Sequence, residues 1–333
     1  MRAVVCRSFD DPAATRVEEV APPPMVEGGV RIRVRVAGVS FANLLVLAGR
    51  HQNRSEPPFT PGTEVAGVVA EVDGRVKRLR VGDRVVAGVR SGGYAQQVVA
   101  PERTVYPLPD AVSFEQAVHF PTIYATAYAG LKWRAQLAPG ETVLVHGAAG
   151  GSGLAAIEIA RCLGARVIAV AGTDEKLEAA RRHGAQVLVD RRAGPVPQAV
   201  LEATGGRGAD VVFDPVGGDA FSDSMRCVAP EGRLLPIGFA SGEVPSVAAN
   251  IALVKNVTVI GLYWGWYVGW GRVPPPEGMA QRVWAAFDEM LHWCAEGRLN
   301  PETFATFPLE RFREALDAVA SRRVIGRVAL TTD

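Results

Sequence analysis

The sequence lacks the features that define several large classes of protein. Its 36 basic and 35 acidic residues leave a net charge of +1, so neither nucleic acid nor an acidic membrane is expected as the main partner. It contains no apolar run of about 18 residues, which argues against a membrane-spanning helix. Its first residues, MRAVVCRSFDD, lack the long apolar core of a signal peptide, and we therefore expect a cytoplasmic protein.

Cysteines and metal ligands are also scarce. Four widely separated cysteines with no CxxC pair are typical of buried, reduced thiols rather than of disulfides or structural zinc. They are Cys6, Cys162, Cys227 and Cys294. The five histidines share no ligand spacing, so no metal site is expected, and His146 is expected to be a packed turn residue. Gly151-Ser152-Gly153 lacks the G-x-S-x-G spacing of a serine hydrolase nucleophile.

What the sequence does contain points to two domains. Its 333 residues exceed one average domain, and 48% of them are hydrophobic, enough for substantial cores. Residues 1–120 alternate apolar and polar positions in short segments such as Val30–Val36, which predicts a small β-barrel or sandwich. Residues 121–263 predict alternating strands and helices, hence a parallel sheet with helices on both faces. Residues 264–333 are too few for another domain and are expected to complete the first one.

Individual elements can be placed by their periodicity and their turn signals. The strands expected in the second region are Thr142–His146, Arg166–Ala171, Gln186–Val189, Asp210–Asp214, Arg233–Phe239 and Val257–Tyr263. The helices expected there and in the last region are Leu154–Leu163, Glu175–His183, Gln281–Ala295 and Phe312–Ala320.

A glycine-rich loop joins the first of these strands to the first helix. It reads Ala148-Ala149-Gly150-Gly151-Ser152-Gly153, close to the G-x-G-x-x-G of a dinucleotide site but with alanine at the first position. Gly150 would let the backbone approach a pyrophosphate, and Gly153 would allow close packing of the helix. Ala148 is compatible with this if φ there is negative. The alternative is a tight turn that binds no ligand.

The next strand end predicts which dinucleotide is bound. An NAD site usually places an acid at this tip, whereas here the tip reads Gly172-Thr173, and Thr173-Asp174 resembles a helix N-cap. Lys176 then lies in the first helical turn, where the helix dipole disfavours a cation unless a phosphate is bound nearby. Only four of the 36 basic residues are lysines, which makes this position notable. We therefore expect NADPH; the alternative is that Lys176 is simply solvated.

An aromatic stretch, Tyr263–Trp270, follows the last predicted strand of the second region. Two interpretations remain open for it. The rings are either core residues, or some of them line an apolar substrate cleft or a dimer surface.

Taken together, these motifs resemble the zinc-independent, zeta-crystallin-like quinone oxidoreductases of the medium-chain dehydrogenase/reductase superfamily. The likeness covers nearly the whole chain. It is carried by GVSFANLL (38–45), PGTEVAG (61–67), VGDRV (81–85), GGYA (92–95), TAY (126–128), PGE (139–141), the loop 146–153, DVVFDPVGG (210–218) and IGFASG (237–242).

The resemblance implies a fold and a set of cofactor contacts. The fold is α/β: a Rossmann doubly wound parallel sheet inserted into a GroES-like β-barrel catalytic domain. Lys176 and Arg322 would bind the 2′-phosphate of NADPH, with Arg191 in place of a family tyrosine. Ser40, Thr126, Gly238 and Phe239 would line the nicotinamide. His51 stands where a tyrosine is frequent, and a homodimer is expected.

The reaction implied is hydride transfer from NADPH to a quinone or related conjugated carbonyl, without zinc. A quinone could take its proton from solvent, while an enone needs a donor, for which Tyr128 and then His51 are candidates; both are also plausible packing or rim residues. Two alternatives remain. The chain is either an enoyl-thioester or other alkene reductase with the same cofactor, or a crystallin-like structural or RNA-binding protein.

Overall fold

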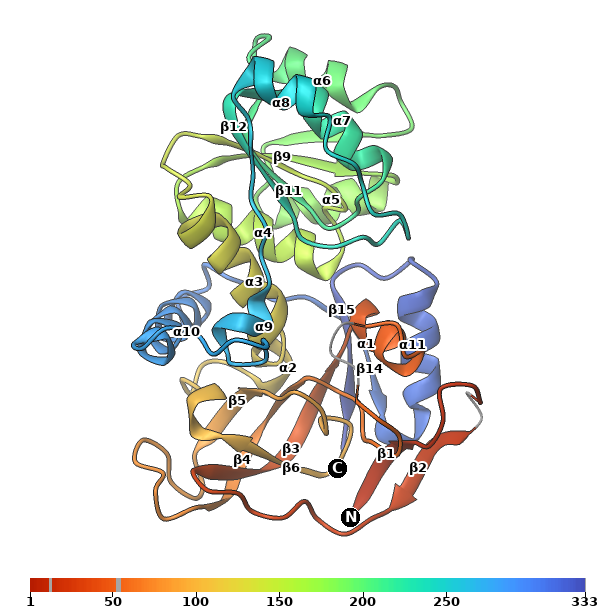
Figure 1. Cartoon of the computed structure of the whole chain (residues 1–333), viewed down its shortest axis with the longest axis vertical. Coiled ribbons are helices and arrows are strands. Elements are labelled where there is room, and N and C mark those ends of the chain that lie inside the picture. Colours follow the sequence, from red (N-terminus) through yellow and green to blue (C-terminus); the bar gives the residue numbers. More distant parts are fainter. Residues whose placement is uncertain (12–13, 52–54, 333) are drawn as a thin grey trace. The chain divides into compact units, whose positions relative to one another are not determined.

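The computed structural model in Figure 1 describes residues 1–11, 14–51 and 55–332. The chain forms two compact units. The first unit comprises Met1–Thr122, Gly265–Gly297 and Pro301–Asp333, and the second comprises Ile123–Trp264 and Arg298–Asn300. In the part of the chain that the structure describes, no helix is both long and apolar enough to cross a membrane.

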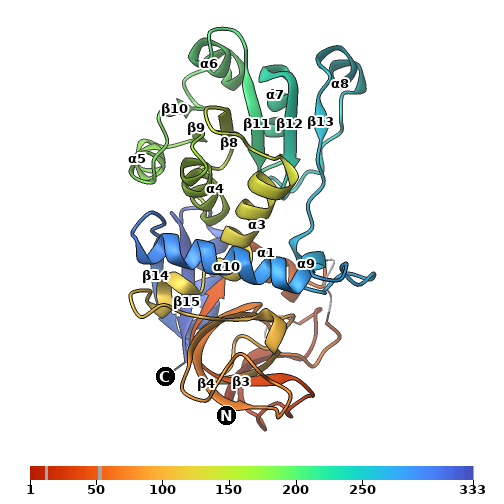
Figure 2. The same cartoon turned by 90° about the vertical axis from the view of Figure 1, so that its left-hand side faces the viewer.

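The second unit is built on a six-stranded parallel sheet. Its strands are β8 (Thr142–Val145), β9 (Arg166–Ala171), β10 (Val187–Asp190), β11 (Ala209–Asp214), β12 (Val228–Pro236) and β13 (Thr258–Val259). Their order is β10-β9-β8-β11-β12-β13, which Figure 2 shows from one edge to the other. In chain order this is 3-2-1-4-5-6, the doubly wound dinucleotide-binding arrangement. Strand order reverses between β8 and β11, and ligands bind such sheets at the carboxyl ends of the strands at this point.

Five helices pack against this sheet. They are α4 (Gly151–Cys162), α5 (Asp174–Arg182), α6 (Val196–Ala203), α7 (Asp219–Cys227) and α8 (Ala249–Lys255). Because helices cover the sheet, its central strands are buried along their length: all four residues of β8 and all six of β11 are buried. The expected strand at Val257–Tyr263 is shorter than predicted, because only Thr258 and Val259 pair with β12.

The first unit contains a seven-stranded sheet and a two-stranded one. The small sheet pairs β1 (Arg2–Cys6) with β2 (Thr15–Glu19). The large sheet contains β3 (Gly29–Val39), β4 (Glu64–Val72), β5 (Arg84–Gly88), β6 (Gln97–Pro101), β7 (Val105–Pro107), β14 (Thr303–Pro308) and β15 (Arg327–Thr331). Its order is β14-β15-β3-β4-β5-β7, with β6 also on β3. The C-terminal strands therefore complete a sheet begun by the N-terminal ones.

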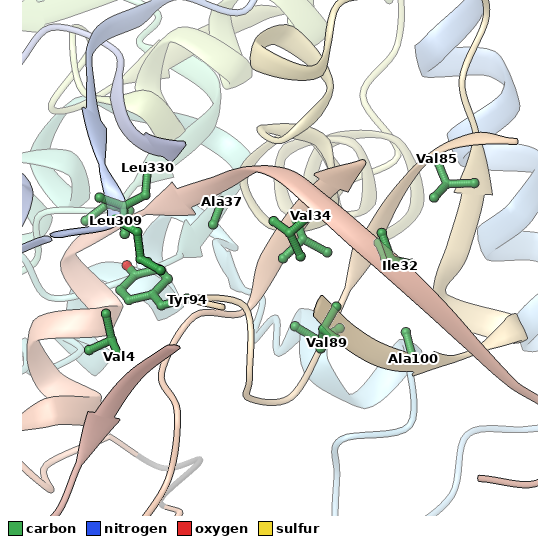
Figure 3. Close-up of a cluster of buried hydrophobic side chains, with 14 of the residues drawn as sticks. Val4, Ile32, Val34, Ala37, Val85, Val89, Tyr94, Ala100, Leu309 and Leu330 are labelled. Carbon is green, nitrogen blue, oxygen red and sulfur yellow. The ribbon is translucent and has the colours of Figure 1, made fainter. Parts of the chain in front are cut away.

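The alternation predicted in β3 is confirmed by its burial. Val30, Ile32 and Val34 are buried, whereas the arginines between them are half-buried or exposed. Figure 3 shows Ile32 and Val34 in the core of this unit beside Val85 and Val89. The helices of the unit include α1 (Phe41–Leu47), α2 (Phe114–Ala117), α10 (Met279–Ala295) and α11 (Phe312–Ala320).

Two segments at the changeover between the units have no simple period in the sequence. One runs through π-helical turns at Phe120–Tyr124 and Ala129–Arg134 with α3 (Ala125–Tyr128) between them. The other contains the single turn α9 (Trp264–Tyr267). Nearly every position from Phe120 to Leu131 is buried. A segment buried on all sides leaves no polar face from which to predict a helix.

Candidate dinucleotide-binding site

The turn after β8 has the conformation that the alanine-containing fingerprint requires. The left-handed residue is Gly147, with φ of 56°, and Ala148 is not among the residues with positive φ. The N–H of Ala148 donates to the carbonyl of Val170, 3.1 Å away, which ties the turn to β9. Alanine at the first fingerprint position is therefore compatible with the turn.

Gly153 is the position where the loop and its helix approach most closely. A Cβ atom there would lie 2.4 Å from the carbonyl oxygen of Gly147 and 2.7 Å from the Cα of Ala148. Helix α4 begins after the N-cap Gly150, which offers no side-chain cap, and Ala149 before it is buried. The first N–H groups of a helix have no intrahelical acceptor, so Gly151 and its neighbours Ser152 and Gly153 form a site suited to an anion.

Helix α5 begins at the tip of β9. The Thr173 hydroxyl accepts a hydrogen bond from the N–H of Lys176 at 3.3 Å and caps the helix, which confirms the predicted capping for Thr173. Lys176 lies in the first turn and its side chain is half-buried.

Two consecutive arginines after β10 meet this tip in different ways. A Cβ atom at Gly172 would lie 2.7 Å from Nε of Arg191, so the Arg191 guanidinium lies against the glycine. Arg192 instead binds Asp190 at 2.7 Å and Asp174 at 2.8 Å. These hydrogen bonds from Arg192 lower the pKa of Asp190 to about 2. Arg192 therefore occupies the two acids, which favours a phosphate over a ribose diol at this tip.

The loop after β12 carries the residues expected to line the nicotinamide in this unit. Gly238 and Phe239 follow the strand, and Phe239 is 44% exposed. The N–H of Ala240 donates to the Pro215 carbonyl at 3.1 Å, so the loop is tied to the residues that follow β11. Thr126 is half-buried on α3.

Three predicted site residues belong to the first unit. Ser40 is the N-cap of α1, and both its N–H and its hydroxyl donate to Oδ1 of Asn43, at 2.8 and 2.9 Å. His51 follows α1 and is half-buried; Arg322, after α11, is exposed and has φ of 57°. The roles of these residues toward a cofactor remain predictions.

Tyr128, the first candidate proton donor, is a packed residue. Its side chain is only 4% exposed. Trp133 meets its ring edge-on at 5.7 Å between centroids, and Nζ of Lys132 lies 4.8 Å from the ring centre.

The aromatic stretch 263–270 contains both buried core residues and accessible residues, the two interpretations that the sequence left open. Trp264 and Val268 are buried, whereas Tyr263 is 36% exposed. Tyr267 and Val268 also line a cavity of about 320 Å³ within the first unit. The stretch is therefore partly core and partly accessible.

The sequence predicted a packed environment for one histidine of this unit. His146 is buried, as expected for a packed turn residue, and its Nε2 lies 2.8 Å from Oγ of Ser224. Burial lowers the pKa of His146, opposed in part by Asp214 and Asp223. Across residues 1–11, 14–51 and 55–332, no three His, Cys, Asp or Glu side chains are grouped as metal ligands. All four cysteines are thiols.

Sequence reasoning missed one buried network in this unit. Glu158 on α4 is 2% exposed and accepts hydrogen bonds from the Tyr124 hydroxyl at 2.6 Å and from the Asn300 N–H. Nδ1 of His183 lies 2.8 Å from its carboxylate. The available signal was a lone acid inside the apolar run LAAIEIA.

Comparison with known proteins identifies relatives along nearly the whole chain. Residues 26–110 match the family model "Alcohol dehydrogenase GroES-like domain", and residues 151–274 match "Zinc-binding dehydrogenase". "Quinone oxidoreductase-like protein 2" of Rattus norvegicus is 39% identical over 99% of this chain and 92% of its own length. "Quinone oxidoreductase" of Pseudomonas aeruginosa is 32% identical over 97% of both chains. The structure of Escherichia coli quinone oxidoreductase complexed with NADPH matches with a TM-score of 0.90 and 27% identity over 100% of both chains.

These findings confirm the family resemblance and the predicted fold class, a Rossmann doubly wound sheet together with a GroES-like domain. The chain belongs to the quinone oxidoreductase family of the medium-chain dehydrogenase/reductase superfamily.

Proposed function

We propose that the protein is an NADPH-dependent oxidoreductase that reduces a quinone or related conjugated carbonyl by hydride transfer, without zinc. The observation that carries the cofactor choice is the tip of β9, where Arg191 lies against Gly172 while Arg192 binds Asp174. The E. coli relative whose structure matches this chain was solved in complex with NADPH.

Each part of the site has a proposed task. The N–H groups of residues 149–153 bind the pyrophosphate at the start of α4. Lys176, Arg191 and Arg322 bind the 2′-phosphate, and the two arginine forks suit its geometry. Ser40, Thr126, Gly238 and Phe239 orient the nicotinamide. The first unit is proposed to be the catalytic domain and the second the cofactor-binding domain.

The chemistry itself needs little from the protein. NADPH supplies the hydride, and a conjugated carbonyl already accepts it, so the residues mainly fix the geometry of the reactants. For a quinone we propose that solvent provides the proton, which the burial of Tyr128 supports. The proposal of zinc-independence is tested by metal analysis, which should find well under one equivalent of zinc; a stoichiometric zinc would contradict it.

The function is tested by measuring NADPH oxidation with a naphthoquinone and, in parallel, with crotonyl-CoA. We expect turnover with the quinone and little with the thioester. The opposite preference would identify the alkene-reductase alternative. No turnover together with salt-dependent binding of RNA would favour the non-enzymatic one.

Replacing Lys176 with alanine should weaken NADPH binding selectively. Loss of one charged contact to the 2′-phosphate should raise the Kd for NADPH about tenfold. NADH lacks that phosphate, so its Kd should hardly change. Isothermal titration calorimetry with both nucleotides checks this, with Lys77→Ala, an exposed lysine of the first unit, as the matched control. Equal losses for both nucleotides would refute the assignment.

We also propose a cytoplasmic homodimer formed through the β13 edge of the six-stranded sheet. Figure 2 shows α8 at the same edge, and no residue of this helix is buried. Leu253 is 77% exposed, Val254 78% and Val259 36%. This apolar surface borders the outer edge of β13, which pairs with β12 and with no other strand among the described residues.

A double substitution Leu253→Glu and Val254→Glu tests the dimer. It should convert a dimer of the wild type into a monomer in light scattering, because four added carboxylates would face one another across the two-fold interface. Leu188→Glu serves as the control, because it changes an exposed apolar residue on β10, the edge strand at the other end of the same sheet. A monomeric wild type, or a dimer that survives the double substitution, would contradict the proposal.

A further inference from the structure

Asp214 lies at the carboxyl end of a central strand of the six-stranded sheet but contributes no predicted cofactor contact. It is the last residue of β11, between β8 and β12, and is 1% exposed. Its Oδ1 accepts two backbone hydrogen bonds, from the N–H of Val216 at 2.8 Å and from that of Gly217 at 3.1 Å. These bonds turn the chain directly after the strand and fix the residues 215–218 that follow.

On one side, the segment 215–218 contacts the turn after β8, residues 147–150, which we call the pyrophosphate turn. A Cβ atom at Gly147 would lie 3.1 Å from Cγ2 of Val216 and 3.6 Å from Cγ of Pro215. Gly147 is the left-handed residue that begins the glycine-rich loop. A shift of Val216 or Pro215 would therefore reach the backbone of this loop directly.

The same segment touches the proposed nicotinamide loop on its other side. The Pro215 carbonyl accepts from Ala240, and the Val216 carbonyl accepts from the N–H of Ser241 at 2.9 Å. A Cβ atom at Gly217 would lie 2.8 Å from the carbonyl oxygen of Glu243 and 3.1 Å from the Phe239 ring. One short segment thus spaces the two loops that would hold the pyrophosphate and the nicotinamide of the dinucleotide.

The second carboxylate oxygen of Asp214 is expected to reduce the stability of the fold, so stability does not explain why this residue is present. Oδ2 is buried and has no hydrogen-bond partner among the residues that the structure describes. A buried carboxylate with one unsatisfied oxygen is expected to destabilise the fold, and such groups concentrate at functional sites.

We propose that Asp214 is a positioning residue that sets the spacing between the pyrophosphate turn and the nicotinamide loop. It acts through residues 215–218 rather than by touching the cofactor. The inference rests on the proposed binding of NADPH. It assigns to Asp214 the relative placement of the two loops that would hold the pyrophosphate and the nicotinamide.

The test compares two ligands that differ in how much of the site they span. Asp214→Ala should raise the Kd for NADPH about tenfold, because two hydrogen bonds to a charged acceptor are lost. Adenosine 2′,5′-bisphosphate lacks the nicotinamide, so its Kd should change less than about threefold. Asp214→Asn keeps an acceptor oxygen for both N–H groups and should bind NADPH within about threefold of the wild type.

Asp210 provides a matched control at the other end of the same strand. It is also buried, and its Oδ2 accepts from the N–H of Thr142 at 2.8 Å. Asp210→Ala should lower the melting temperature without changing the ratio of the two Kd values. If Asp214→Ala does not fold, Gly217→Ala displaces the same segment from Glu243 and should give the same selective loss.

The outcomes separate the inference from the proposed function. If the wild type binds NADPH but Asp214→Ala and Gly217→Ala bind it as tightly as the wild type does, the inference alone is overturned. Equal loss of both ligands would show a general structural role and overturn it as well. A wild type that binds neither ligand would overturn the proposed function, and the inference with it.

Discussion

Replacing Gly153 with alanine should disrupt both the fold of the cofactor loop and NADPH binding. The added methyl would lie 2.4 Å from the carbonyl oxygen of Gly147 and 2.7 Å from the Cα of Ala148, and both are backbone atoms that cannot rotate away. Overpacking of this kind costs about 1–3 kcal/mol, more than the gain of about 1 kcal/mol in helix propensity. Because Gly147 must move, the Kd for NADPH should rise by more than about tenfold.

Two other glycine substitutions separate steric damage from loss of the ligand site. At Gly150 a Cβ atom would meet only the Gly147 carbonyl, at an ordinary 3.4 Å. Gly150→Ala should therefore fold normally yet weaken NADPH, because the methyl would face the pyrophosphate. Gly261→Ala adds a methyl in open space and should change neither property.

Chemical denaturation and calorimetric titration of NADPH check all three variants. Normal stability and normal binding in Gly153→Ala would show that the turn has more freedom than its close contacts indicate. Normal binding in Gly150→Ala would contradict the placement of the pyrophosphate at this loop.

Elements with a regular pattern of apolar and polar residues were predictable from the sequence. Strand β9 and helix α11 have the predicted bounds, Arg166–Ala171 and Phe312–Ala320. Strand β12 was not: it was expected at Arg233–Phe239 but runs from Val228 to Pro236. Its first residues contain Pro230 and Gly232, which are turn signals in a sequence, and its pairing with β11 is irregular between Val228 and Arg233.

The candidate site likewise contains features that the sequence predicts and features that depend on the folded sheet. The glycine-rich loop and the Thr173 cap are local features, so residue order alone predicted them. The different roles of Arg191 and Arg192 depend on how the end of β10 lies beside the tip of β9, some twenty residues earlier in the chain. The task inferred for Asp214 depends on three loops that meet only after the sheet has formed.

The ion pair between Glu64 and Arg327 should show how strongly the C-terminal strand is tied into the first unit. Arg327 on β15 donates two hydrogen bonds to the carboxylate of Glu64 on β4, at 2.6 and 2.9 Å. The side chains are 4% and 0% exposed, so solvent does not screen the pair. Arg327→Met should lower the free energy of unfolding by about 3–5 kcal/mol, because it leaves a buried carboxylate without its partner.

The reason for that loss predicts its reversal. The double variant Glu64→Leu and Arg327→Met removes both charges, and apolar replacements of a buried pair are often neutral or stabilising. It should therefore recover most of the lost stability, which a double-mutant cycle in urea measures. Arg311→Met, which breaks the exposed pair with Glu314, should lower the stability far less than Arg327→Met does, because solvent screens that pair. If the double variant is no more stable than Arg327→Met, the loss comes from packing of the arginine side chain rather than from the unpaired charge.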